Sequence, residues 1–219
     1  MKRRYIALLI PTISLLTSCM KSPLRSDIIE FIASFSIELA MQNYTHATYT
    51  REDISIENDV TSIIVKKMTI NRDDLAYDYI EKTHEEDKET SSVHRYIEKR
   101  EEKYFYITES EETERSKEQV NDLINNFFYT SSKEGIYTGG MFMGDAFREI
   151  LPDIQDLVTI DSENKLLVYS YVNTMKDDNK EVVITQTVTL DEYGMLVKED
   201  LEKTSDLGIF KTHIEVKKL

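Results

Sequence analysis

The chain contains a single cysteine, Cys19, and the residues around it suit nucleophilic chemistry. The thiolate of a cysteine is a strong nucleophile, provided that a reaction partner can reach the sulfur atom. The residues before it, Thr17 and Ser18, are small, so a modifying enzyme has access to the sulfur and to the backbone. Because no second cysteine is present, a disulfide within the chain is excluded. The sequence therefore predicts covalent modification of the Cys19 thiol.

The segment before Cys19 has the composition of an export signal. Its first four residues include Lys2, Arg3 and Arg4, and the twelve residues from Tyr5 to Leu16 are uncharged. A helix that spans a bilayer needs about 20 apolar residues, and this run is shorter and contains a proline and several hydroxyl residues. We therefore predict that residues 1–18 are a cleavable signal peptide and not a transmembrane anchor.

The motif Leu16-Thr17-Ser18-Cys19 resembles the lipobox of bacterial lipoproteins. The resemblance implies that the Cys19 sulfur takes a diacylglyceryl group through a thioether bond. It also implies that residues 19–25 tether the rest of the chain to the membrane. Two acyl chains anchor a protein stably, since each buried CH₂ contributes about 0.8 kcal/mol. We expect a lipid-anchored protein on the extracytoplasmic side of the cell membrane; the alternative is a chance cysteine after an ordinary signal.

The overall charge argues against nucleic acid as a partner. The formal net charge is −14, and removal of residues 1–18 takes away three basic residues and no acid, which leaves −17. Binding to nucleic acid needs a clustered basic face, whereas the Lys and Arg residues here are interleaved with acids. A hydrophobic content of 40% with 31% charged residues is typical of a globular domain, which we place at residues 26–219.

The spacing of apolar residues predicts helices and strands in alternating groups. We expect a helix over 26–42, another over 116–130, and a shorter one over 141–151 that ends at Pro152. Period-two patterns rich in Thr, Ile and Tyr predict nine strands. These strands cover 44–56, 60–71, 75–83, 93–99, 103–108, 165–173, 181–190, 195–203 and 209–217. The charged stretches 84–90 and 109–114 are expected to be solvated loops, and Asp191 to Gly194 supplies a hairpin turn.

This element order predicts an α+β fold, with a curved antiparallel sheet that forms an open half-barrel and helices packed on its concave face. Behind a lipobox, the arrangement is similar to the LolA/LppX-like superfamily of lipoprotein carriers and lipid-binding lipoproteins. The residues that carry the likeness are the amphipathic helix at 26–42, the Tyr-rich segment 95–107 and the hairpin at 191–194. The resemblance implies a lipid or other apolar ligand in a cavity of the curved sheet, or a structural descendant without one, and no catalytic residues.

Two apolar clusters are candidates for a ligand pocket. Phe127 and Phe128 form the first, and Met141, Phe142 and Met143 form the second. Flexible methionine and aromatic side chains adapt to irregular apolar ligands. The alternative is that the same residues are ordinary core, because helical faces that pack on a sheet need them as well.

The sequence offers no pattern for catalysis, metal binding or cofactor binding. The histidines His46, His84, His94 and His213 have no second ligand at a helical offset, and the acidic stretches lack the glycine turn of a calcium loop. Nucleophile elbows and phosphate-binding glycine loops are also missing. We therefore expect neither an enzyme nor a metal site nor a cofactor. Two alternatives remain: a protein that contacts another envelope protein without a ligand pocket, and a hydrolase with carboxylates or histidines of perturbed pKa in a cleft.

Overall fold

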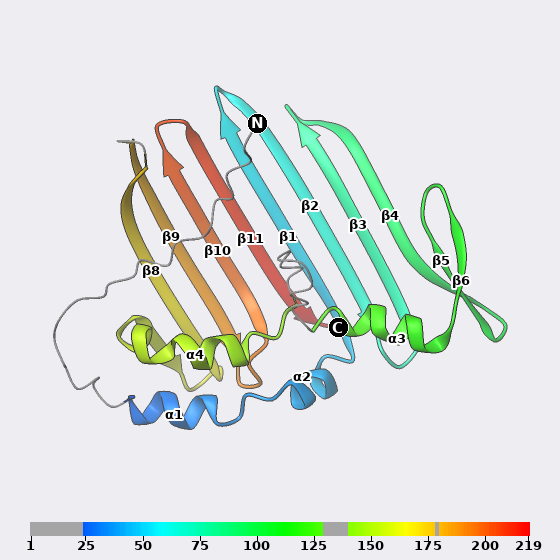
Figure 1. Cartoon of the computed structure of the whole chain (residues 1–219), viewed down its shortest axis with the longest axis horizontal. Coiled ribbons are helices and arrows are strands. Elements are labelled where there is room, and N and C mark those ends of the chain that lie inside the picture. Colours follow the sequence, from blue (N-terminus) through cyan, green and yellow to red (C-terminus); the bar gives the residue numbers. More distant parts are fainter. Residues whose placement is uncertain (1–23, 129–139, 178–179) are drawn as a thin grey trace, which may run out of the picture.

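The computed structural model describes residues 24–128, 140–177 and 180–219. The predicted signal peptide and Cys19 lie outside the described residues. Eleven strands form one antiparallel sheet in the order β6-β5-β4-β3-β2-β1-β11-β10-β9-β8-β7. Every neighbouring pair is consecutive along the chain except β1 and β11, which join the two halves of the sheet at its centre (Figure 1).

The strand bounds follow the chain in two groups on either side of a helical segment. The first group is β1 (His46–Glu57), β2 (Val60–Asn71), β3 (Ala76–Glu85), β4 (Lys88–Arg100), β5 (Lys103–Ile107) and β6 (Glu112–Arg115). The second group is β7 (Val158–Asp161), β8 (Leu166–Asp177), β9 (Lys180–Asp191), β10 (Leu196–Ser205) and β11 (Gly208–Lys218). The two outermost strands, β6 and β7, are the shortest, and they leave the sheet open.

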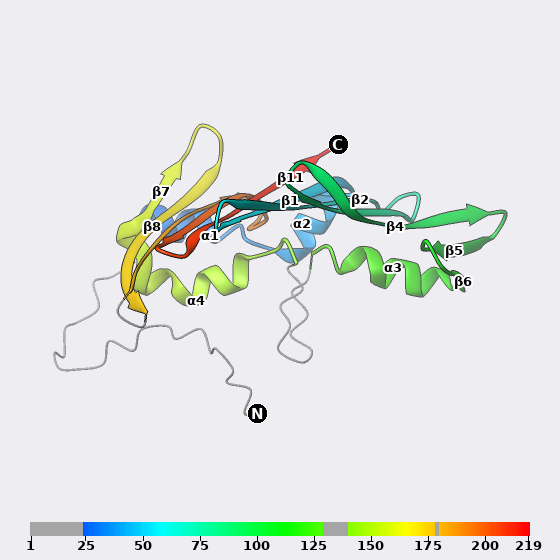
Figure 2. The same ribbon diagram turned by 90° about the horizontal axis from the view of Figure 1, so that it is seen from above.

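The helices lie together across one end of the strands (Figure 1). They are α1 (Ser26–Ile32), α2 (Ile37–Asn43), α3 (Lys117–Asn125) and α4 (Gly144–Ile154), and α4 is followed by the 3₁₀ helix η2 (Gln155–Leu157). Figure 2 shows α3 and α4 on the same face of a curved sheet. The hydrophobic core fills the layer between these helices and the nearby strand ends, and the far halves of the long strands extend beyond the helices.

Strand alternation sends one set of side chains into this core, because successive residues point to opposite faces. Each central strand contributes one or two residues near its helical end. These residues are Ala47 and Tyr49, Ile70, Tyr77, Leu167, Val188 and Leu190, Leu196, and Ile214 and Val216. The residues that alternate with them along the same strands are largely threonines, charged residues and histidines, as expected for a sheet that is solvated on one side.

The predicted α+β class and the curved, open antiparallel sheet are confirmed. The packing of helices specifically on the concave face stays a prediction.

All nine predicted strands are present, and β2 has the predicted bounds. The sequence did not indicate the short edge strands β6 and β7. The expectation of a loop over 109–114 is wrong from Glu112 onward, and β3 and β4 extend into the stretch 84–90, which leaves only a two-residue turn.

The continuous helix predicted over 26–42 is wrong, because the structure divides it into α1 and α2. Ser36 is the N-cap of α2, and its hydroxyl accepts a hydrogen bond from the first turn of that helix. At the break, the guanidinium of Arg148 in α4 donates to the carbonyl oxygens of Ile32 at 2.9 Å and Phe35 at 2.6 Å. The Ile32 oxygen also accepts a hydrogen bond from the Phe35 N–H at 3.2 Å. The break therefore depends on a tertiary contact that the helical spacing does not contain.

The prediction that Pro152 ends the third helix is also wrong, since α4 continues to Ile154. Proline removes one backbone donor from a helix and costs about 3 kcal/mol in a helix interior. Here Phe147 and Leu151, with exposed fractions of 2% and 0%, pack into the core on the preceding turns. Their burial holds the last turn of α4 in place despite the proline.

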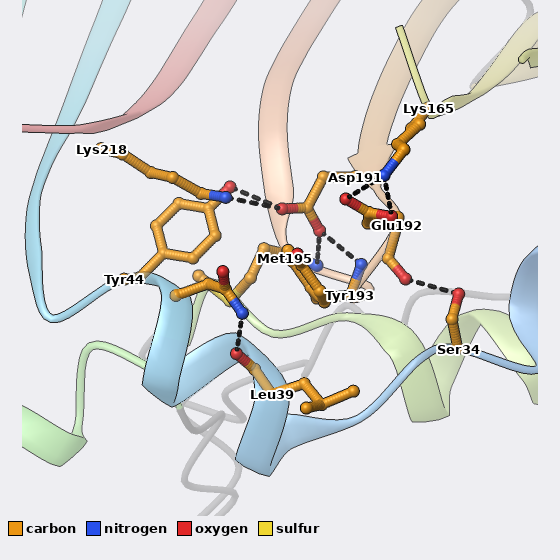
Figure 3. Close-up of polar contacts among 10 residues, drawn as sticks. Ser34, Leu39, Tyr44, Lys165, Asp191, Glu192, Tyr193, Met195 and Lys218 are labelled. Carbon is orange, nitrogen blue, oxygen red and sulfur yellow. Dashed lines mark hydrogen bonds and ion pairs between the residues drawn. The ribbon is translucent and has the colours of Figure 1, made fainter. Parts of the chain in front are cut away.

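The predicted hairpin turn between β9 and β10 is confirmed, and it is built around Asp191. Its carboxylate accepts hydrogen bonds from the backbone N–H groups of Tyr193 at 2.9 Å and Met195 at 3.0 Å (Figure 3). Gly194 has a φ of +85°, a conformation that glycine adopts without strain. The same carboxylate binds the Tyr44 hydroxyl at 2.8 Å, so the turn is joined to the end of α2.

Candidate ligand groove

The two apolar clusters predicted to line a pocket are brought together by the fold. Phe127 and Phe128 follow α3, and their rings meet edge to face with centroids 5.2 Å apart. The backbone N–H of Met141 donates to the Phe127 carbonyl at 2.8 Å, and that of Phe142 donates to the Phe128 carbonyl at 3.1 Å. The two clusters therefore lie side by side.

The second cluster is also held against the β9–β10 hairpin. The Met143 N–H donates to the Gly194 carbonyl at 2.9 Å, and the Leu196 N–H donates to the Met141 carbonyl at 2.7 Å. Phe127, Phe128 and Met141 are buried, with exposed fractions of 0%, 0% and 3%, whereas Phe142 and Met143 are half-buried. All five belong to the hydrophobic core or pack against it, and their role in ligand binding stays a prediction.

A groove lies between α3 and the strands β4 and β5. Its volume is about 400 Å³, and it is open to solvent on one side. Apolar and polar side chains from the sheet and from the helix contribute almost equally to its lining. The apolar residues are Ile97, Tyr106, Val120 and Leu123, and the polar ones are Arg115, Gln119, Asp122 and Asn126.

Helix α3 covers its apolar side chains unequally. Helix α3 buries Val120 and Ile124 completely, yet Leu123 on the same side of the helix is only half-buried. Under α4, the Phe147 ring is 2% exposed and meets the Tyr169 ring edge to face, with centroids 5.9 Å apart. The apolar surface of Leu123 is therefore available to a ligand.

The position of α3 is set by its N-terminus. The Ser116 hydroxyl accepts a hydrogen bond from the Gln119 N–H at 3.2 Å, and the Gln119 side chain accepts one from the Ser116 N–H at 2.9 Å. This reciprocal capping box satisfies two backbone donors at the start of the helix. Because Ser116 directly follows β6, the cap fixes α3 beside the sheet edge at which the groove opens.

Arg115 brings a positive charge to the lining of the groove. It is the last residue of β6, it is half-buried, and its guanidinium lies 5.7 Å from the centroid of the Tyr106 ring. Among the residues that the structure describes, no carboxylate forms an ion pair with Arg115. A guanidinium binds carboxylate and phosphate oxygens through paired N–H groups, so Arg115 is suited to an anionic ligand group.

A larger depression lies on the other side of α3 and is lined mainly by charged residues. Its volume is about 960 Å³. The lining includes Arg72, Asp73, Asp74, Lys99, Lys117 and Glu118. Charged side chains prefer water to apolar ligands, so this depression is a poorer site for an apolar molecule than the groove.

The histidines in the described strands do not gather. His94 hydrogen bonds to Asp78 at 2.6 Å and His213 to Asp200 at 2.6 Å, each across one strand pair. Within the described ranges, no group of three or more His, Cys, Asp or Glu side chains is placed to hold a metal ion. The helices of the described part are all too short or too polar to cross a membrane.

Comparison with known proteins gives no family. No family model and no curated protein matches the sequence. Among solved structures, a beta-barrel-like protein of domain of unknown function DUF1849 from Brucella abortus is 8% identical, with a TM-score of 0.26, over 80% of this chain and 98% of that one.

Two further structures are similar at the same level. A domain from Vibrio parahaemolyticus described as an outer membrane lipoprotein-sorting protein is 10% identical over 83% of this chain and 91% of its own, with a TM-score of 0.23. A DUF1329 family protein from Desulfovibrio piger is 10% identical over 84% of this chain and 90% of its own, with a TM-score of 0.23. Because these scores are low, we draw no conclusion about function from them.

Sequence reasoning identified parts of the groove but not the groove itself. Ile97 and Tyr106 lie in the Tyr-rich segment that carried the family resemblance. Leu123 lies within the helix predicted over 116–130, and Arg115 follows an acidic stretch that was expected to be a loop. The only sequence signal for Arg115 was a basic residue directly before a helix cap.

Proposed function

We propose that this protein is a membrane-anchored, extracytoplasmic lipoprotein that binds an amphipathic lipid. In this proposal the acyl chain lies in the groove between α3 and strands β4 and β5, and the anionic headgroup binds Arg115. The observation that carries the proposal is the groove under α3, whose lining combines apolar side chains with one arginine that has no carboxylate partner among the described residues.

The size and lining of the groove favour a small amphipathic ligand. Ligand pockets have volumes of roughly 300–1,000 Å³, are mostly apolar and carry a few polar groups that fix the orientation of the ligand. The groove, at about 400 Å³, lies at the lower end of this range. Each buried CH₂ of an acyl chain contributes about 0.8 kcal/mol, so even a short buried segment of the chain supports binding.

Anchoring through Cys19 is the second part of the proposal, and it is supported by the sequence of the signal and the lipobox. Replacement of Cys19 by serine removes the thiolate that would take the diacylglyceryl group. We expect the Cys19→Ser protein to lose lipid labelling and to leave the membrane fraction when cells are fractionated. Equal membrane association and equal maturation of the two proteins would contradict anchoring at this residue.

Binding in the groove is tested by titrating the full chain with a fluorescent fatty acid. We expect saturable binding of one probe molecule per chain. Leu123→Gln places a polar amide where Leu123 would contact the acyl chain of the probe. The loss of about 1.4 kcal/mol of apolar contact should weaken binding about tenfold.

The matched control is Leu39→Gln, the same replacement on α2 at a leucine that is 41% exposed and lies outside the groove. This variant should bind the probe as the parent does. Arg115→Gln should also weaken binding, whereas Arg115→Lys should retain part of it because the charge is kept. Equal affinities for the Leu123 and Leu39 variants would reject the groove as the binding site.

A further inference from the structure

The first described residues are fixed to the end of the sheet that carries the helices. The Arg25 N–H donates to the Gln155 side chain at 3.0 Å, and the Arg25 guanidinium donates to the Val158 carbonyl at 3.0 Å. Leu24 is half-buried and packs against the core. The predicted tether therefore joins the domain at the start of α1, beside η2, at the helical end of the molecule (Figure 1).

The length of the tether limits how far this point can lie from the membrane. In the proposed lipoprotein, the five residues 19–23 separate the lipid from Leu24. A fully extended chain spans at most about 3.6 Å per residue, so Leu24 lies within about 18 Å of the lipidated residue. Strand β11 has 11 residues and is about 36 Å long, at about 3.3 Å per residue. The helical end is therefore held at the membrane, whereas the opposite end of the sheet is free to stand well above it.

Apolar side chains are exposed where the tether joins the domain. Ile29 lies one turn after Arg25 on the same side of α1, since its N–H donates to the Arg25 carbonyl at 3.0 Å, and it is 50% exposed. Leu157 lies between the two residues that bind Arg25 and is 43% exposed. Single exposed apolar residues are common on protein surfaces. These two, however, flank the residue through which the domain is joined to its anchor.

The charged groups on this surface favour a zwitterionic lipid surface. Arg25 forms an ion pair with Asp27, so neither side chain contributes a net charge. A long arginine side chain places its guanidinium at the level of the headgroups while apolar neighbours reach deeper. Glu30 and Asp156 add negative charge beside this pair, and an anionic leaflet repels such groups. The contact therefore depends on the apolar side chains and not on charge attraction.

We infer that the start of α1 and the helix η2 dock onto the surface of the bilayer, with Ile29 and Leu157 inserted below the headgroups and the sheet directed away from the membrane. The inference rests on the lipid anchor of the proposed function. The anchor holds this surface close to the bilayer, so a contact too weak to bind a free protein is sufficient within one anchored molecule. Coverage by a second copy or by an envelope protein is an alternative that the test separates from docking.

The docking is tested with a single introduced tryptophan, because the chain has none of its own. Leu157→Trp places the indole at the proposed contact. Leu207→Trp is the matched control, since Leu207 is 65% exposed in the β10–β11 turn at the opposite end of the sheet (Figure 1). The lipidated full chains are reconstituted into phosphatidylcholine vesicles whose acyl chains carry bromine close to the headgroup. Bromine quenches the fluorescence of an indole that comes into contact with it.

We expect the brominated lipid to lower the fluorescence of Leu157→Trp at least about twofold and that of Leu207→Trp by less than about a tenth. Ile29→Trp provides a second indole on the same surface and should respond as Leu157→Trp does. Phosphatidylglycerol in place of part of the phosphatidylcholine should reduce the quenching. Equal quenching at residues 157 and 207, or none at residue 157 because water or another protein covers the indole, would overturn the inference.

A failure of the anchor is distinguishable from a failure of the docking. The mass of the purified chain shows whether Cys19 carries the diacylglyceryl group, and flotation shows whether the chain stays with the vesicles. A chain without the lipid would overturn the anchor and the docking together. A lipidated chain that floats with the vesicles but leaves the indole of Leu157→Trp unquenched would overturn the docking alone.

Discussion

Replacement of Asp191 by alanine is expected to lower the free energy of unfolding by about 3 kcal/mol, because three hydrogen-bond donors lose their charged acceptor. Asp191 is only 8% exposed. Its carboxylate accepts two backbone hydrogen bonds in the β9–β10 turn and one from the Tyr44 hydroxyl, and Lys218 Nζ lies 4.0 Å away (Figure 3).

The size of this effect follows from the position of Asp191 between three parts of the chain. Tyr44 ends α2, Lys218 ends β11, and the turn itself leads into β10. The Lys218 ammonium lies 4.6 Å from the centroid of the Tyr44 ring and 5.0 Å from that of Tyr193. Without the carboxylate, the Tyr44 hydroxyl and two backbone N–H groups lose their acceptor in a buried place, and each such loss costs about 1–3 kcal/mol.

The measurement is urea unfolding of the Asp191→Ala protein against the parent. Asp206→Ala is the matched control, because Asp206 is an exposed aspartate in the β10–β11 turn. The control should change stability by no more than about 0.5 kcal/mol. If both variants unfold at the same urea concentration, the carboxylate does not hold the three parts together.

Alkaline conditions are expected to destabilise the protein strongly, with a loss of about 2 kcal/mol from Tyr77 alone by pH 12. Burial raises the pKa of Tyr77 from 10 to about 12, with a smaller contribution from the nearby Tyr106. Burial also raises the pKa values of Tyr44, Tyr49 and Tyr79, and hydrogen bonds to Asp191 and Glu81 add to the increase for Tyr44 and Tyr79.

The direction follows from the higher pKa in the folded state. Below pH 10 the phenol is neutral in both states, and its contribution to stability is fully present. Between pH 10 and 12 the unfolded chain ionises Tyr77 while the folded chain does not, so unfolding becomes easier as the pH rises. Stability is therefore lost progressively as the pH passes through the folded-state pKa.

Urea unfolding at a series of pH values tests this expectation, with tyrosinate absorbance to follow ionisation. Tyr77→Phe removes the ionisable group but keeps the aromatic ring, so this variant should lose less stability than the parent between pH 10 and 12. If the parent and Tyr77→Phe lose stability in parallel over this range, the burial of Tyr77 does not control the alkaline transition.

The strands were the part of the fold that the sequence predicted best, because an alternating pattern is local. The bounds of β2 match the prediction, and the Asp191 to Gly194 turn is where it was expected. The edge strands β6 and β7 escaped prediction because four residues are too few to show a period. The division of the first helix escaped it because the capping of Ile32 and Phe35 comes from Arg148, which is more than a hundred residues away in the chain.

The groove could not be predicted because it depends on how closely a helix approaches a sheet. The pattern of α3 indicates which residues face inward, but it does not show that Leu123 remains half-buried while Val120 and Ile124 are covered. The aromatic and methionine clusters at Phe127 and Met141 had the composition of a pocket, and the fold places them in the core or against it, beside the β9–β10 hairpin. Their role in ligand binding stays a prediction. Composition alone does not distinguish a pocket from a core.

Lipid binding in the groove is tested most directly by native mass spectrometry of the full chain extracted from its own envelope. We predict that the parent and Leu39→Gln each carry one lipid-sized adduct that is not covalently bound and that dissociates on activation. The Leu123→Gln protein should carry the adduct in a much smaller fraction of molecules. A parent without any adduct, or an adduct that is equally abundant in the Leu123→Gln protein, would contradict the proposal.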